Sequence, residues 1–405
     1  MQFLFRLLFL LLILAPSIAG ADEIILEFDQ LAGMLEASPS GRLLLSERDA
    51  RLADAQSALQ WTNPELEVER EALSSDMENE TETLIAVGKS FKTPWAGAAH
   101  RKAQRFDKEA IEYDIEYQKL LLLADWKSMY VDLKLKQMLQ SQLADFQDMI
   151  QEVSQISADR REQGTTSGLE DQLLQMSLFN VKATMLHLNS DIRQLENSFK
   201  NQLGVPVKQS LILKSQIGFS KISLNSVQQD GVVASPQLKS LQSQMASAKK
   251  MIAMEKGNVL PELHVTGGYK QVNDELSGSV IGLSIPLPIL NTNRAAVQRA
   301  QARMMSKSIE YDLTRAELVY KIQESTILIR DAQSLLDEYA DMFSSTRVMS
   351  DLVFSFKEGW ITLTDLLSGI QVYADALESY YTHLAHYYDT IFYMEVLTGE
   401  ELVQF

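Results

Sequence analysis

The sequence of 405 residues contains no cysteine. This absence excludes disulfide bonds, thiolate metal sites, a cysteine nucleophile and lipid attachment at an N-terminal cysteine. The sequence also contains no phosphate-binding glycine loop, no His-Glu-x-x-His motif and no Gly-x-Ser-x-Gly motif. We therefore predict no catalytic residue, no cofactor and no bound metal, and we expect that the protein is not an enzyme.

Basic residues are fewer than acidic ones. The chain has 37 Lys and Arg against 54 Asp and Glu, a formal net charge of −17. Such a surface repels nucleic acid and favours cations, although an acidic balance also serves solubility alone. We expect no nucleic-acid partner.

Apolar runs long enough to form a membrane-spanning helix are also absent. The apolar run Leu7–Leu14 follows Arg6 and precedes the small residues 19–21, which is the pattern of a secretory signal peptide cleaved after Ala21. An uncleaved anchor is the alternative, but a spanning helix needs about 20 apolar residues. The sequence predicts a signal peptide at residues 1–21 and export to the periplasm.

Proline is missing from two stretches, between Pro94 and Pro206 and from Pro288 to the C-terminus. Apolar residues in both stretches recur at steps of three and four, which is coiled-coil spacing. The strong helix breakers inside them are at residues 164–168 and 357–360. Each stretch therefore predicts a long helix, a turn and an antiparallel return, and a helix over 98–163 would be on the order of 100 Å long.

The chain contains two similar halves offset by about 195 residues, as from Gly164 to Gly359. Asn-Pro-Glu-Leu at 63–66 and Leu-Pro-Glu-Leu at 260–263 each open a pair of extended segments, the second members of which span 83–91 and 279–287. Apolar and polar residues alternate along them, which is typical of β-strands with one apolar face. Strands of about ten residues can cross a bilayer, although two soluble hairpins on a helical core would show the same pattern.

These patterns divide the chain into four parts. After the signal peptide, residues 22–205 form a first repeat with a helix, a strand pair at 63–92 and a helical hairpin at 95–203. An insert of mixed structure spans 206–235. A second repeat at 236–405 has a helix, a strand pair at 260–288 and a helical hairpin at 292–397.

Four strands are too few to close a barrel, and lipid does not tolerate open sheet edges. A spanning unit of this kind must therefore assemble with copies of itself. Three copies would give twelve strands, and their helices would pack into a tube below the barrel. The fold class we predict is mainly α, with long antiparallel coiled-coil helices and four β-strands per protomer in duplicated halves, forming a trimeric α/β barrel duct.

Several phrases of the sequence are similar to those of one known family. They are Asn-Pro-Glu-Leu at 63–66, Gly-Lys-Ser-Phe at 88–91, Ile-Pro-Leu at 285–287 and Gly-Trp-Ile-Thr-Leu-Thr-Asp-Leu-Leu at 359–367. These phrases occur in the same order and are duplicated in the same way in the TolC-like outer-membrane efflux proteins. The chain resembles that family along essentially its whole length after the signal peptide. The resemblance implies a homotrimer in outer-membrane lipid with a long periplasmic portion. It also implies two protein partners, a periplasmic adaptor (membrane fusion) protein and an inner-membrane pump of the RND type.

The resemblance also implies a periplasmic constriction at the helix turns, where acidic side chains line a narrow ring. The matching positions are Asp365 and Glu170, each six residues after a glycine. A ring of carboxylates would concentrate cations, whereas an acid in the first turn of a helix also serves ordinary capping. Residues Gly164, Gly168 and Gly359 mark the helix-turn tips where the adaptor would dock. Ser368 and Ile361 replace charged residues often found in the family, which argues against a salt-bridge lock of the familiar type.

Two other groups of residues could suggest metal handling, but packing explains both better. His383 and His386 lie among tyrosines on the final helix, and Met304, Met305, Met342 and Met349 are scattered. The compact loops and short C-terminus are more similar to the heavy-metal efflux branch of the family, so metal cations or small toxic compounds are the expected cargo. The alternative function is a periplasmic coiled-coil adaptor or structural protein without a pore.

Overall fold

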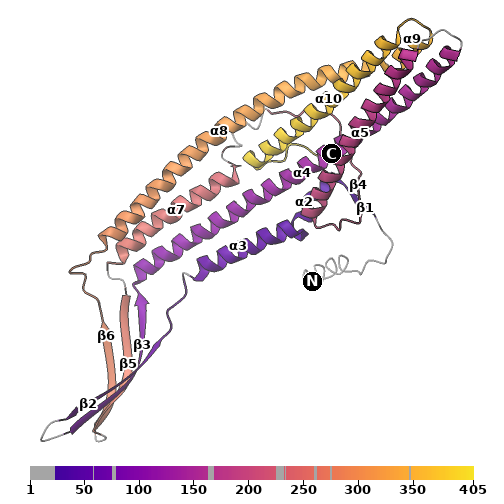
Figure 1. Ribbon diagram of the computed structural model, residues 1–405. Coiled ribbons are helices and arrows are strands. Elements are labelled where there is room, and N and C mark those ends of the chain that lie inside the picture. Colours follow the sequence, from indigo (N-terminus) through magenta and orange to yellow (C-terminus); the bar gives the residue numbers. More distant parts are fainter. Residues whose placement is uncertain are drawn as a thin grey trace, which may run out of the picture.

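The computed structural model describes residues 23–57, 59–74, 79–162, 168–224, 232, 234–259, 262–273, 276–345 and 348–405. These residues form an elongated molecule with four strands at one end and helix tips at the other (Figure 1). The predicted signal peptide, residues 1–21, and the tip residue Gly164 lie outside the described residues. Within these ranges no helix has both the length and the apolar character needed to cross a membrane.

The four strands form one antiparallel sheet in the order β2-β3-β5-β6. Their bounds are β2 Glu65–Ser74, β3 Asn79–Lys92, β5 Glu262–Val272 and β6 Leu276–Ser284. The first hairpin therefore pairs directly with the second, through β3 and β5, although Lys92 and Glu262 are 170 positions apart in the chain. The sheet is open, and β2 and β6 are its edges.

The helices run beside one another away from the sheet (Figure 1). Their bounds are α3 Pro39–Ser57, α4 Pro94–Glu162, α5 Gly168–Leu203, α7 Pro236–Gly257, α8 Arg294–Ser345, α9 Val348–Lys357 and α10 Leu363–Thr398. α4 packs against α3 and α5 on one side and against α7 and α10 on the other, and α8 packs against α7 and α10. The result is an open layer with α3 and α5 at one edge and α8 at the other.

α4 illustrates why these helices are so long. It has 69 residues, about 100 Å at 1.5 Å per residue, and its single proline is the first residue, where a missing N–H costs nothing. Its apolar residues at steps of three and four are all buried in the main core, namely Leu139, Leu143, Phe146, Ile150 and Val153. Packing of this stripe, rather than intrinsic propensity alone, stabilises the rod.

Two of the rods consist of helices that meet end to end. Gly204 directly follows α5, and a Cβ on this residue would come within 2.6 Å of the ring of Pro39 at the start of α3. Gly399 directly follows α10, and its Cβ would come within 3.3 Å of the ring of Pro236 at the start of α7. Both glycines have positive φ, 78° and 74°, which favours glycine at the end of a helix. The same junction thus occurs once in each half.

A small parallel sheet lies beside the middle of the rods. It pairs β1, Glu23–Leu26, with β4, Ser210–Leu213. The Tyr130 hydroxyl of α4 donates to the Leu26 carbonyl at 3.1 Å and accepts from the Ser215 N–H at 3.0 Å. The short helical turns η1 Phe28–Gln30, α2 Leu31–Met34 and η2 Leu35–Ala37 connect β1 to α3. β1 was not predicted from the sequence, and the region 206–235 was predicted only as mixed structure.

One predicted boundary differs from the structure. The extended segment expected at 279–287 is a strand only to Ser284, because Pro286 has no N–H to donate to a neighbouring strand. The second long helix, predicted to reach the turn at 357–360, corresponds to α8 and α9, which lie on either side of residues 346–347, outside the described residues.

Candidate functional site

The turn between α9 and α10 lies at the end of the molecule away from the strands (Figure 1). Gly359 has a φ of 75° and closes α9, with the Trp360 N–H donating to the Ser355 carbonyl at 2.8 Å. A side chain at position 359 would meet open space, so the backbone conformation and not crowding requires glycine here. Lys357 reaches from this turn to Glu152 of α4, with 2.6 Å between its Nζ and Oε1.

Asp365 forms a reciprocal cap at the start of α10. Its Oδ2 accepts from the Thr362 N–H at 3.0 Å and from the Thr362 hydroxyl at 2.6 Å. The Thr362 Oγ1 in turn accepts from the Asp365 N–H at 3.2 Å. These bonds from the Thr362 side chain and backbone lower the pKa of the exposed Asp365 carboxyl. Asp365 is therefore a fixed, ionised carboxylate at the helix tip, and it also performs the ordinary capping role.

The other predicted tip residues belong to the α4–α5 turn. Gly168 is the first residue of α5, and a Cβ there would meet open space. Glu170 lies in the first turn of the same helix, and its side chain is not among those described. The structure thus places the first turns of α5 and α10 at the same end of the layer.

Sequence reasoning missed an exposed aromatic pair at this tip. Trp360 is 71% exposed and Phe354 is 51% exposed, and their rings meet edge to face at 5.5 Å. Exposed aromatic residues at the end of a rod are typical of a protein-binding surface. The quoted phrase at 359–367 includes this tryptophan, but its partner becomes visible only when α9 folds.

The sheet at the opposite end has two different faces. One face carries large apolar side chains that are between 41% and 87% exposed, and its members are Leu66, Val68, Ile85, Val87, Val265, Tyr269, Ile281 and Leu283. The other face carries mainly small residues, and a Cβ at Gly268 would come within 2.7 Å of the Ala86 Cα. Crowding of this kind is expected on the inner side of a strongly curved sheet. Glu65, Glu67 and Glu69 of β2 are in register with this small-residue face.

The two edges of the helix layer also carry exposed apolar stripes. On α5 the buried residues Leu174 and Leu188 face the layer, and a second stripe points the opposite way, formed by Leu169, Met176, Phe179 and Leu186. On α8 the buried residues Ile322 and Ile329 are opposed in the same way by Leu313, Tyr320 and Ile327. The α5 stripe repeats at steps of seven and three residues and the α8 stripe at steps of seven, which is the spacing of a helix packed on both sides.

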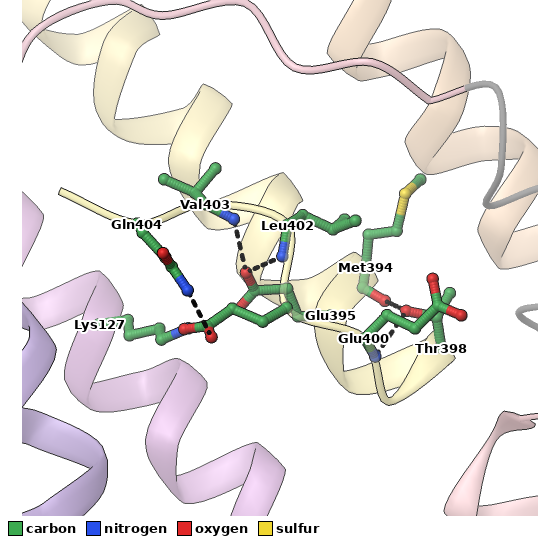
Figure 2. Close-up of polar contacts among 9 residues, drawn as sticks. Lys127, Met394, Glu395, Thr398, Glu400, Leu402, Val403 and Gln404 are labelled. Carbon is green, nitrogen blue, oxygen red and sulfur yellow. Dashed lines mark hydrogen bonds and ion pairs between the residues drawn. The ribbon is translucent and has the colours of Figure 1, made fainter.

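A buried ion pair joins the two halves at the level of β1 and β4. Lys127 of α4 is 6% exposed and Glu395 of α10 is 8% exposed, with 2.8 Å between Nζ and Oε2. The other oxygen of Glu395 accepts from the N–H groups of Leu402 and Val403 at 2.7 and 3.2 Å (Figure 2). Lys127 also contacts the carboxylate of Glu401 at 3.2 Å. The network therefore fixes the last residues of the chain against α4.

The two histidines of α10 do not form a shared site. The ring of His383 stands 6.3 Å from the ring of Tyr339, whereas His386 lines a cavity of about 460 Å³ between α4, α5 and α10 with Asp132, Asp191 and Asp389. No cluster of three or more His, Asp or Glu side chains in the described part of the chain is arranged to hold a metal ion. Of the four methionines singled out, Met349 is buried in the core and Met305 is exposed.

Solved structures similar to this chain include outer-membrane channels. The outer-membrane channel OprN has a TM-score of 0.75 at 13% identity, covering 92% of this chain and 89% of that one. The outer membrane protein VceC from Vibrio cholerae has a TM-score of 0.74 at 12% identity, covering 92% and 96%. The Campylobacter jejuni CmeC outer membrane channel has a TM-score of 0.72 at 15% identity, covering 92% and 84%.

Comparison of the sequence with protein-family models and with curated proteins gives no match. The likeness thus lies in the fold, over nearly the whole length of both chains. This chain has the TolC-like fold, and the predicted mainly α fold with long helices and four antiparallel strands per protomer is confirmed.

Proposed function

We propose that the chain is the outer-membrane channel subunit of a tripartite efflux system, a passive exit duct that spans the outer membrane and the periplasm. The observation that carries this proposal is the open architecture of both layers. The sheet ends in the unpaired edge strands β2 and β6, and the helix layer ends in exposed apolar stripes on α5 and α8. In a monomer, the backbone groups of the edge strands would stay unpaired and the apolar stripes would stay exposed to water, and both favour association with another chain.

Joining copies edge to edge satisfies both layers at once. The β2 edge lies on the α3 side of the molecule and the β6 edge lies on the α8 side, so one rotation brings β6 against β2 and α8 against α5 and α3 of the next copy. A head-to-tail contact repeated by rotation gives a closed ring. Three copies supply twelve strands, and we propose a homotrimer.

The closed ring would place the two faces of the sheet in different solvents. The exposed apolar face would contact the outer-membrane lipid, and the small-residue face with its row of glutamates would line water. The helices of about 100 Å would extend the duct across the periplasm. The exposed pair Phe354 and Trp360 supports docking of a periplasmic adaptor at the tips, with an RND-type pump below it.

Asp365 is the residue we assign to the periplasmic constriction, with Glu170 as its counterpart in the first half. Three copies would bring three ionised Asp365 side chains to the narrow end, where a ring of carboxylates attracts cations. Metal cations and small toxic compounds are the cargo classes we propose.

Single-channel conductance of the detergent-extracted protein in planar bilayers tests this function. We expect a stable, cation-preferring conductance that loses most of its preference in Asp365→Asn. Asp351→Asn, at an exposed acid in the first turn of α9, is the matched control and should keep the preference. Because Thr362 lowers the pKa of Asp365, the wild-type preference should persist on acidification and fall only below the ordinary aspartate pKa of about 3.9.

Either of two results would contradict the proposal. A water-soluble monomer that never inserts would favour the adaptor or structural protein without a pore. If the protein conducts and Asp365→Asn and Asp351→Asn behave alike, the channel function stands but Asp365 does not line the constriction.

A further inference from the structure

A zone of unusual charge surrounds the helix ends next to the sheet. The segments 89–108, 249–259 and 291–307 contain 13 Lys and Arg but only two Asp and Glu, in a chain with a net charge of −17. We call their basic residues the basic collar: Lys89, Lys92, Arg101, Lys102, Arg105, Lys108, Lys249, Lys250, Lys256, Arg294, Arg299, Arg303 and Lys307. The net charge of the whole chain hides this zone, because the strand turns and the helix tips are acidic.

The charges of the basic collar are mostly left without acidic partners. Among the described residues, the collar's ion pairs are those of Arg105 with Glu109 and Lys307 with Glu310, each about one turn away on its own helix. Lys89 instead stands over the rings of Trp61 and Phe91, at 4.9 and 5.5 Å from their centres. Unpaired cations gathered in one zone produce a strong local field, which is available to an external anion.

Part of the collar lines a groove above α7. This cavity of about 540 Å³ has Arg299 and Arg303 of α8 on one wall and Asp107 of α4 on the other. Asp107 is occupied by a hydrogen bond to Ser247 on the floor. Two guanidinium groups without ion-pair partners, one turn apart on the same wall, match the size and charge of a phosphate group.

An apolar surface lies between this groove and the sheet. Leu287, Ile289 and Leu290 are between 74% and 100% exposed, and together with Lys92 they line a second cavity of about 810 Å³. The segment exposes few backbone donors, because Pro286 and Pro288 have none and the Ile289 N–H bonds to the Leu287 carbonyl at 2.9 Å. A backbone with few free donors is suited to contact with lipid.

We propose that the junction of sheet and helices binds an anionic phospholipid, with its phosphate between Arg299 and Arg303 and its acyl chains along Leu287, Ile289 and Leu290. The order from the sheet outward, apolar and then basic, follows the polarity of a lipid in the leaflet that faces the periplasmic helices. This inference rests on the proposed outer-membrane position of the sheet. The lipid would anchor a chain that has no cysteine for lipid attachment.

Native mass spectrometry of the detergent-extracted assembly tests the proposal with two lipids of eight-carbon chains, phosphatidylglycerol and phosphatidylcholine. We expect the anionic lipid to bind in preference to the zwitterionic one. Arg299→Gln/Arg303→Gln should weaken its binding roughly thirtyfold, since two cations near the headgroup are lost. Arg315→Gln/Arg330→Gln, with the same charge change at exposed positions of α8 outside the collar, should retain it.

Equal binding of both lipids, or equal loss in both double variants, would overturn the inference. Full displacement of the lipid by inorganic phosphate would also overturn it, because the collar would then be a site for a soluble anion in the duct. Protection of Leu287 and Leu290 by a neighbouring copy, with no lipid bound, would assign the apolar surface to the subunit interface. Conductance measured on the same preparation separates the two proposals. If the protein conducts but binds no lipid, the lipid site is wrong and the channel function stands.

Discussion

The ion pair at the middle of the rods and the basic collar near the sheet use charge in opposite ways. Lys127 and Glu395 are almost fully buried and bonded to each other, and their remaining contacts hold the end of the chain. Arg299 and Arg303 are exposed and have no ion-pair partner among the described residues. The first arrangement is costly to break but offers nothing to a ligand, and the second adds little stability but leaves its charge available.

The largest effect is expected from Lys127→Met. The change leaves the Glu395 carboxylate buried without its cation, which costs about 3 to 5 kcal/mol of unfolding free energy in comparable sites. Denaturant unfolding in detergent, followed by circular dichroism, would measure it. Lys136→Met is the control, because it removes a half-buried pair with Asp132 on the same helix and should cost about 1 kcal/mol or less. Similar losses in the two variants would show that the buried pair contributes no more than a partly exposed pair.

A smaller effect is expected from Asp107→Asn inside the collar. Burial raises the pKa of the Asp107 carboxyl, so the folded state holds the proton more tightly than the unfolded state does. The wild-type protein should therefore lose stability as the pH rises through the pKa of the folded state, and the asparagine variant should not. Melting temperatures between pH 3.5 and 7.5 would show the variant as the more stable protein at neutral pH and as equal to wild type at the acidic end.

If the wild-type protein were instead the more stable one at neutral pH, the ionised form of Asp107 would be the stabilising form. The arginines of the groove would then be its partners. Lipid binding gives a second readout at pH 7, because Asp107→Asn removes a negative charge from the groove. We expect tighter binding of phosphatidylglycerol.

The smallest effect on stability is expected from the variant with the largest effect on lipid binding. Arg299→Gln/Arg303→Gln removes exposed charges without partners, so its unfolding free energy should stay within about 0.5 kcal/mol of wild type. Arg315→Gln/Arg330→Gln should behave alike in this measurement. If only Arg299→Gln/Arg303→Gln lost several kcal/mol of unfolding free energy, the collar arginines would stabilise the fold as the Lys127 ion pair does.

Features that repeat along the sequence could be predicted. The alternation of Leu66 and Val68 with glutamates indicated the strands, and the absence of proline after Pro94 indicated the length of α4. The glycine at 359 marked the turn because a positive φ at the end of a helix favours that residue. These are local signals, and the structure places β2, α4 and the end of α9 where the signals are.

Features made from distant segments could not be predicted. Lys127 and Glu395 are 268 positions apart, and neither belongs to a local sequence pattern that indicates a buried ion pair. The basic collar gathers three segments that an overall charge of −17 conceals. The exposed stripe of α5 was overlooked because Met176 and Phe179 alternate with the core residues of the same helix, and only burial separates the two faces. Asp365 was found by resemblance, and its bonds to Thr362 required the folded turn.

The end-to-end junctions of helices set the order in which the molecule can be completed. α3 can form its junction with α5 only when Gly204 has been made, and α7 can form its junction with α10 only when Gly399 has been made. Because synthesis starts at the N-terminus, more than 140 further residues must be added after α3 or α7 before the helix that it meets is complete. The second half in particular lacks this junction until Gly399 has been made, so a chain truncated before Gly399 would leave the start of α7 without the helix end that it meets.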